Sequence, residues 1–258
     1  MGYETLIVKR EENIGIVTLN RPPANPINLT VLEELDKVLT EFERDKTIRV
    51  LIITGAGEKG FSAGFDLKSA GEPGAEKTGP RGVEVLNRIE QFPKPIIAAI
   101  NGFALGGGCE LAMACHFRIM VDSERAIIGL PEIERGLIPG WGGTQRLPRL
   151  IGKTKALEIM IFGTKLRATE AQNVGLVTMV SHEGETMRDA KDFARVLGKK
   201  APLAVKAILD SVNRGLEINI EDGLKIERSN ADMVGNSQDA VEGIMAFLQK
   251  REPMFKGE

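Results

Sequence analysis

Asn101-Gly-Phe-Ala-Leu-Gly-Gly-Gly-Cys-Glu110 joins an apolar segment to a helical one through three consecutive glycines. Residues 95–100 before it are typical of a buried strand, and residues 109–115 at its end are typical of a helix. The first N–H groups of a helix lack intrahelical acceptors, and glycines let the backbone approach a ligand closely. We therefore expect unpaired amide donors at the glycines, pointing at whatever group sits beyond them.

A second glycine-flanked segment, Phe61-Ser-Ala-Gly-Phe-Asp-Leu-Lys68, lies upstream of this run. Together the two segments offer two amide N–H groups that could clamp one developing oxyanion. Glu110 falls in the first turn of the predicted helix, and Glu132 follows in Gly129-Leu-Pro-Glu132. Oxyanion donors beside paired carboxylates suit proton transfer next to a carbonyl group.

The rest of the chain alternates between apolar strands and amphipathic helices until about residue 190, after which only helices are expected. The predicted strands are 6–8 and 14–19, which form a hairpin, then 49–54 and 95–100. The predicted helices are one after a capping box at Thr30-Val-Leu-Glu33, one at 83–92, one at 203–212 and a long stretch at 220–250. This alternation implies an α/β fold with some parallel pairing. We divide the chain into a core at 1–190 and a C-terminal helical region at 191–258, with a Gly- and Pro-rich loop at 69–80 beside the proposed site.

Bulk properties narrow the classes of function. The 258 residues suffice for one main domain, and a net charge of −2 gives no basis for nucleic-acid binding. The two cysteines, Cys109 and Cys115, have neither disulfide-framework nor zinc spacing, which favours reduced thiols in a cytoplasmic protein. No signal peptide is visible, and the apolar run 95–115 contains Asn101, Glu110 and four glycines, so we expect no membrane segment.

Two familiar motifs overlap near residue 60, and we assign function to neither. Gly55-Ala-Gly-Glu-Lys-Gly60 matches the dinucleotide pattern GxGxxG, but no apolar-faced helix follows it. Gly60-Phe-Ser-Ala-Gly64 matches the GxSxG nucleophile pattern, which needs its serine at a strand-to-helix turn and a histidine nearby. A charged Glu58-Lys59 turn separates the strand from Ser62, so a hydrolase triad is disfavoured.

Several segments together resemble the crotonase, or enoyl-CoA hydratase/isomerase, superfamily. They are Ala63-Gly-Phe-Asp66, the run from Asn101 to Glu110, Pro131-Glu132, and Gly136-Leu-Ile-Pro-Gly-Trp-Gly-Gly-Thr-Gln-Arg146. The resemblance extends from Leu6 to Phe255, which is essentially the whole chain. It implies the crotonase (ClpP-like) spiral of strand-strand-helix units followed by a C-terminal helical region.

The resemblance also implies an enzyme that reversibly hydrates a trans-2-enoyl-CoA to a 3-hydroxyacyl-CoA. In the family, the backbone N–H groups at the positions of Phe65 and Gly107 bind the thioester oxygen, and the two acids at Glu110 and Glu132 hold one water between them. Like charges so close push their titrations apart, so one acid is expected to be ionised and the other protonated. We assign Glu110 as the base at C3 and Glu132 as the acid at C2.

The resemblance suggests further contacts to substrate, namely Ala63, Asp66, Leu67, Lys68, Gly140 and Trp141. Lys68 is the first candidate for the CoA phosphates, and Lys250, Arg251 and Lys256 are the others, serving a neighbouring subunit in a homotrimer or homohexamer. Trp141 suits either the acyl pocket or the apolar core. CoA is part of the substrate, so no separate cofactor and no metal is expected.

Two other functions remain open from the sequence. An enoyl-CoA isomerase of the same fold can work with one acid, although the glycine at position 140 lacks the additional acid of dienoyl-CoA isomerases. A non-catalytic CoA- or RNA-binding protein of the same fold is the second alternative. The two glutamates count against the CoA-binding form, and the balanced charge counts against the RNA-binding form.

Overall fold

A six-stranded sheet in the order β1-β2-β3-β5-β7-β10 forms the centre of the computed structural model, which describes residues 2–57, 59–71 and 74–258. Its strands are β1 (Leu6–Glu11), β2 (Ile14–Leu19), β3 (Val50–Gly55), β5 (Ile96–Ile100), β7 (Phe117–Val121) and β10 (Met179–Ser181). β1 and β2 form the predicted antiparallel hairpin, and the other neighbours pair in parallel. β3 and β5 are buried along their whole length, as the apolar runs of a covered parallel sheet require.

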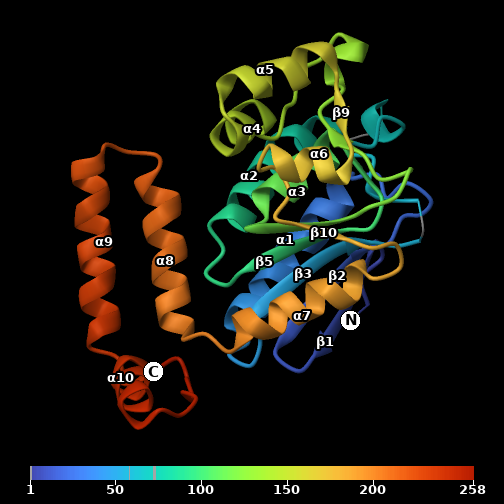
Figure 1. Ribbon diagram of the computed structural model, residues 1–258. Helices are drawn as coiled ribbons and strands as arrows, with labels where there is room; N and C mark the ends of the chain where they lie inside the picture. The colour runs from blue at the N-terminus through green and yellow to red at the C-terminus, as the bar shows by residue number, and fades with distance from the viewer. Residues whose placement is uncertain (1, 58, 72–73) are drawn as a thin grey trace.

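Helices cover both faces of this sheet (Figure 1). The larger apolar core includes residues of α1 (Leu29–Arg44), α2 (Thr78–Glu90) and α3 (Gly107–Ala114). On the other face lies α7 (Thr186–Gly198), whose buried Ala190 and Ala194 pack on apolar side chains of β2, β3 and β5. The alternation of side chains along each strand therefore supplies two separate apolar layers.

A second, smaller sheet brings together the segments singled out in the sequence. It consists of β4 (Gly60–Ser62), β6 (Phe103–Leu105), β8 (Ile128–Gly129) and β9 (Lys165–Leu166), in that order. β4, β6 and β8 run parallel, so their carboxyl ends meet at one edge. The residues that follow these three strands, including both predicted acids, gather there. Parallel pairing of three short strands thus positions the site.

The remaining elements surround this edge. The short 3₁₀ helices are η1 (Ser69–Gly71), η2 (Ala75–Lys77) and η3 (Glu132–Arg135), and the further helices are α4 (Gly143–Ile151), α5 (Lys153–Phe162) and α6 (Ala168–Asn173). The expected loop at 69–80 thus contains two 3₁₀ turns and the start of α2, while residues 72–73 lie outside the described ranges.

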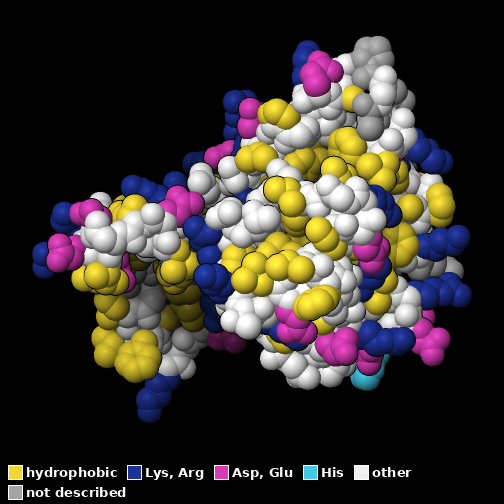
Figure 2. Space-filling view, turned by 90° about the horizontal axis from the view of Figure 1, so that it is seen from above, with side chains coloured by type: hydrophobic (Ala, Val, Ile, Leu, Met, Phe, Trp, Pro, Cys, Tyr) yellow, Lys and Arg dark blue, Asp and Glu magenta, His cyan; other side chains and the backbone are white. Residues whose placement is uncertain are grey.

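Residues 202–258 form an arm that stands away from the core (Figure 1). It contains α8 (Pro202–Gly215) and α9 (Ile220–Gly235), which pack side by side, and α10 (Gln238–Gln249). Large apolar side chains on the arm are exposed, among them Ile208 at 63%, Leu216 at 71% and Phe247 at 83%, and apolar side chains are visible on the arm at the left of Figure 2. Among the described residues, no helix has the length and apolar character needed to cross a membrane.

The α/β class and the C-terminal helices agree with the prediction, but several boundaries differ. The N-cap of α1 is Asn28, whose side chain accepts the Val31 N–H at 3.1 Å, so the capping box at Thr30 was wrong. α2 begins at Thr78 rather than Val83. Pro80 is tolerated there because the first N–H groups of a helix have no intrahelical acceptor.

The predicted division near residue 190 falls inside α7. Because α7 packs on the central sheet, it belongs to the core, and the arm begins with α8. The single long stretch predicted at 220–250 is two helices, since the side chain of Ser237 accepts the Ala240 N–H and starts α10 as a new helix.

Candidate active site

The turn between β6 and α3 presents an unpaired amide at Gly107. Gly106 has φ +54° and ψ −127°, a conformation that L side chains rarely adopt. A Cβ on Gly106 would also lie 3.1 Å from Glu132 Oε1. Gly107 is the first residue of α3, and its N–H donates to no other group in the described part of the chain. The glycines therefore expose the positive end of a helix, as the sequence predicted.

A second unpaired amide, that of Phe65, lies close to the first. Ile27 bonds to both neighbours of Phe65, donating to Gly64 O at 2.7 Å and accepting from Asp66 N at 2.9 Å. In this parallel bridge the N–H of Phe65 points the other way and donates to nothing within the described residues. A Cβ built on Gly107 would be 3.2 Å from Phe65 N, and one built on Gly64 would be 2.6 Å from Gly107 N. The two amides thus lie close together in the wall of one cavity, as two donors to a single oxyanion must.

Glu110 projects from the first turn of α3 and is only 2% exposed. Its Oε1 accepts hydrogen bonds from Trp141 N and Gly143 N, each at 2.7 Å. Burial raises the pKa of Glu110 to about 7, and these two amides act in the opposite direction. Such a carboxyl changes its protonation state near neutral pH, which suits a general base.

Glu132 lies in η3, close to the glycine turn, and is half-buried. Its Oε2 is buried and has no hydrogen-bond partner among the described groups. Burial raises the pKa of this carboxyl above its usual range. An unsatisfied buried carboxyl oxygen is a place where a water molecule or a polar group of a ligand would bind.

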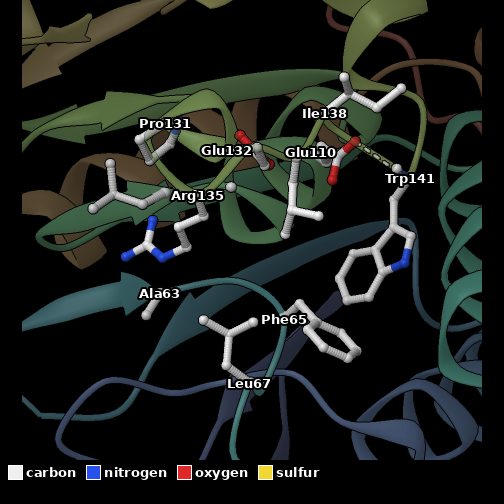
Figure 3. Close-up of a pocket in the computed structure, with 14 residues that line it drawn as sticks. Ala63, Phe65, Leu67, Glu110, Pro131, Glu132, Arg135, Ile138 and Trp141 are labelled. Carbon is white, nitrogen blue, oxygen red and sulfur yellow. Dashed lines mark hydrogen bonds between the residues drawn. The ribbon is translucent and has the colours of Figure 1, made fainter. Parts of the chain in front are cut away.

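A cavity of about 320 Å³ joins these groups. Its wall consists of Ala63, Phe65, Leu67, Leu105, Gly106, Gly107, Glu110, Pro131, Glu132, Arg135, Leu137, Ile138, Gly140 and Trp141. Figure 3 shows the two carboxylates side by side, with Phe65 and Leu67 opposite, Trp141 at one end and Arg135 towards the other. The wall is mostly apolar with a few convergent polar groups, as in most small-molecule sites.

The indole of Trp141 fills the end of the cavity next to α2. It is 4% exposed and meets the Phe65 ring edge-on, with centroids 6.1 Å apart and planes at 78°. A Cβ on Gly82 would lie 2.3 Å from its Nε1, and one on Gly107 would lie 2.5 Å from its Cζ3. Trp141 therefore both packs in the core and lines the cavity, the two roles that the sequence left open.

Some predicted substrate contacts lie elsewhere. Asp66 is absent from the cavity wall; its carboxylate pairs with Arg21 at 2.9 Å, and this pairing, with further hydrogen bonds, holds its pKa low against the effect of burial. Lys68 is exposed outside the wall. Arg251 pairs with Glu242 on the arm, and Lys250 and Lys256 are also on the arm.

Six residues of the cavity wall were not among the predicted site residues, namely Leu105, Gly106, Pro131, Arg135, Leu137 and Ile138. The last three follow Glu132 closely in the chain, but only the turn through η3 and Gly136, with φ +69°, directs them to the cavity. The position of Arg135, three residues after Glu132 in a helical turn, was the one available signal.

The GxSxG and GxGxxG matches near residue 60 have structural roles. The serine of the GxSxG match, Ser62, is fully buried, and its hydroxyl donates to Asn25 O at 2.7 Å and accepts from Gly64 N at 3.0 Å. In the GxGxxG match, β3 ends at Gly55 and β4 starts at Gly60, so no helix opens there as a dinucleotide fingerprint requires. Residue 58 lies outside the described ranges.

The fold places two amides, which donate to none of the described residues, beside two carboxyl groups in one cavity, an arrangement that suits an enzyme that binds an oxyanion and transfers protons. The family model for enoyl-CoA hydratase/isomerase matches residues 9–258. The chain therefore belongs to the enoyl-CoA hydratase/isomerase family, which confirms the resemblance stated from the sequence.

Individual relatives agree along the whole chain. A probable enoyl-CoA hydratase of Bacillus subtilis is 43% identical, over 96% of this chain and 97% of that protein. A short-chain-enoyl-CoA hydratase of Clostridium acetobutylicum is 40% identical, over 98% of this chain and 97% of that protein. The crystal structure of enoyl-CoA hydratase from Bacillus anthracis superposes with a TM-score of 0.94 at 39% identity, covering 99% of this chain and 100% of that one. The crotonase fold and the enoyl-CoA hydratase prediction are confirmed.

Proposed function

We propose that this chain hydrates trans-2-enoyl-CoA thioesters through the cavity between Glu110 and Glu132. The observation that carries the proposal is that the unpaired Phe65 and Gly107 amides lie close together in a cavity that is also lined by buried Glu110 and half-buried Glu132. A thioester oxygen bound by both amides gains the negative charge of an enolate when water adds to C3. Each such donor contributes about 3–4 kcal/mol to transition-state stabilisation.

We assign the two proton transfers as the resemblance to the family implies. Ionised Glu110 takes a proton from water as the oxygen bonds to C3, and protonated Glu132 gives its proton to C2. The new C–O and C–H bonds replace the C2–C3 double bond, and the water O–H bond breaks. Return of the proton from Glu110 to Glu132 through solvent restores the starting state. Water and thioester alone balance this reaction, so we expect no metal and no redox cofactor to be required.

The acyl group of the substrate is inferred to be short. Trp141 closes one end of the cavity, and the glycines at positions 82 and 107 hold its indole against α2 and α3. The opposite side, beside Arg135 and Leu67, is more exposed and suits the long pantetheine chain of CoA. Relatives named short-chain-enoyl-CoA hydratase and crotonyl-CoA hydratase support this choice. Fatty-acid β-oxidation in the cytoplasm is the setting that we propose for the reaction.

We further infer that the arm associates with other copies of the chain in a homotrimer or homohexamer. Its exposed apolar side chains, including Ile220, Ile244 and Phe247, would be costly to leave in water. Light scattering after size-exclusion chromatography tests this directly. A monodisperse monomer at micromolar concentration would contradict the assembly.

The hydration proposal is tested with purified, chelator-treated protein free of nicotinamide cofactors. We expect it to remove the conjugated-thioester absorbance of crotonyl-CoA and to form 3-hydroxybutyryl-CoA. In ¹⁸O-water the label should appear at C3. Conversion of a 3-enoyl-CoA without any gain of water would instead support the isomerase alternative, and release of free CoA would indicate a hydrolase.

A further inference from the structure

Arg146, in the first turns of α4, is a buried cation that does not line the catalytic cavity. Its side chain is 7% exposed. Nε and Nη2 donate to Glu90 Oε2 at 3.0 and 2.8 Å, and Nη2 also donates to Asn87 Oδ1 at 2.6 Å. Both acceptors belong to the last turns of α2. The guanidinium is therefore fixed to α2 by a planar set of bonds that an ammonium group could not reproduce.

The remaining nitrogen of Arg146 holds the turn that contacts the catalytic base. Nη1 donates to Trp141 O at 2.8 Å, while Trp141 N donates to Glu110 Oε1 at 2.7 Å. The Trp141 residue thus has its carbonyl fixed on one side and its amide engaged on the other. Gly142 has φ +103°, and a Cβ there would lie 2.2 Å from Nη1, so the backbone passes directly against the guanidinium.

The same turn starts α4. Gly142 is the N-cap and supplies no side-chain cap, but Gly143 N, the first amide of the helix, donates to Glu110 Oε1. The carboxylate of Glu110 therefore takes the place of a capping side chain. Because both bonds are made to Oε1, their direction determines how Oε2 is presented to the cavity.

We propose that Arg146 is a positioning residue of the hydration: it ties the 141–143 turn to α2, so that two amides hold Glu110 Oε1 and leave Oε2 for the water. This inference rests on the proposed function of Glu110 as base. Without the guanidinium, the buried carbonyl of Trp141 loses a partner, and the turn can relax away from Glu110. A misplacement of the base by about 1 Å costs roughly 100-fold in rate.

Removal of Arg146 also changes the charge environment of Glu110. The groups that face this carboxyl are the amides of Trp141 and Gly143, the carboxyl of Glu132 on η3 and the guanidinium of Arg146 on α4. The amides and the guanidinium lower the pKa of Glu110, whereas burial and Glu132 raise it. Loss of the guanidinium and loosening of the amides therefore shift the pKa of Glu110 upward.

The test compares R146M and R146K with the matched control R88M. Arg88 lies on α2 itself but pairs with Asp36 and Glu43 of α1, so R88M removes an ion-paired arginine that makes no hydrogen bond to the 141–143 turn. Turnover of crotonyl-CoA, its KM and the pH profile of kcat/KM are measured for each protein. Trp141 is the only tryptophan of the chain, so its fluorescence reports the turn itself.

We expect kcat of R146M to fall roughly 100-fold with KM near the wild-type value. The kcat of R146K should lie between those of R146M and the wild-type protein. The acidic limb of the profile should move to higher pH. Trp141 emission should shift to the red, and Trp141 should become more accessible to acrylamide quenching. R88M should match wild type in all of these measurements. If R146M does not fold, R146K and E90Q must show the same directions of change.

Folded Arg146 variants with wild-type kcat, acidic limb and Trp141 emission would overturn the inference. Lowered kcat with an unchanged limb and unchanged emission would also overturn it, because it would indicate a merely structural defect. If the wild-type protein hydrates no enoyl-CoA, the proposed function fails, and the fluorescence comparison still decides whether Arg146 anchors the turn.

Discussion

Replacing Glu110 by glutamine tests the general base with little change in shape. The amide oxygen of glutamine can still accept the N–H groups of Trp141 and Gly143, which now meet Oε1 at 2.7 Å. Glutamine also has nearly the volume of glutamate, which matters because Glu110 is only 2% exposed. What it loses is the ability to take a proton from water. The substitution therefore separates proton transfer from the structural role of the side chain.

The expected size of the effect follows from that separation. General-base catalysis contributes about 10²–10⁴ in rate, so kcat of E110Q should fall by that factor while KM changes little. With a pKa of about 7, roughly a tenth of wild-type Glu110 is ionised at about pH 6 and roughly nine tenths at about pH 8. Wild-type kcat/KM should therefore rise about tenfold over this interval, and E110Q should lose that dependence.

The assay is the loss of enoyl-thioester absorbance, followed from about pH 5 to pH 9 at constant ionic strength. E134Q is the control, because Glu134 lies on η3 beside Glu132 but is exposed and pairs with Lys165. E134Q should retain wild-type turnover and the acidic limb of the wild-type pH profile of kcat/KM. E110Q with wild-type turnover, or with the acidic limb still present, would refute the role of Glu110 as base.

Three further outcomes are expected. E132Q should also lower kcat by orders of magnitude, and the E110Q/E132Q double variant should be barely worse than either single variant, as for residues that act as a unit; additive losses in the double variant would contradict this. G64A should lower the free energy of unfolding by about 1–3 kcal/mol and abolish turnover, because Gly64 has φ +85° and a Cβ there would lie 2.6 Å from Gly107 N. Urea unfolding measures the first effect and kcat the second. A fully active G64A would show that the two amides do not bind the thioester oxygen. W141A should raise kcat/KM for longer enoyl chains relative to crotonyl-CoA, and an unchanged chain-length profile would show that Trp141 does not limit the acyl pocket.

Local patterns in the sequence were enough to predict that the two amides and the two glutamates lie together in one site. Three consecutive glycines before Glu110 indicate unpaired helix amides, since backbone without side chains can adopt this turn and nothing else caps it. Continuous apolar runs located the central strands β3 and β5 within a residue of their ends. Such features depend on a few neighbouring residues, which is why they can be recognised without a structure.

The predicted starts of two helices were wrong because a local rule had an exception there. The start of α2 was missed because Gly79 and Pro80 usually oppose a helix, yet both fall in its first turn, where proline loses no hydrogen bond. The N-cap of α1 was placed at Thr30 because a capping box fits there, but Asn28 provides the cap two residues earlier. In both helices, packing against the core selected between ends that the local pattern allows.

The sequence by itself determined the family, the α/β class, the glycine turn and the two glutamates, because each is carried by residue types at short, fixed spacing. Only the tertiary structure decided that Glu110 is held by amides more than thirty residues away, that Asp66 pairs with Arg21, and that Arg146 bonds to the turn beside Glu110. These contacts join segments distant in the chain, and their geometry depends on how parallel strands and helices pack. Spacing along a chain does not encode such distances, whereas side-chain burial and backbone direction in the folded protein fix them.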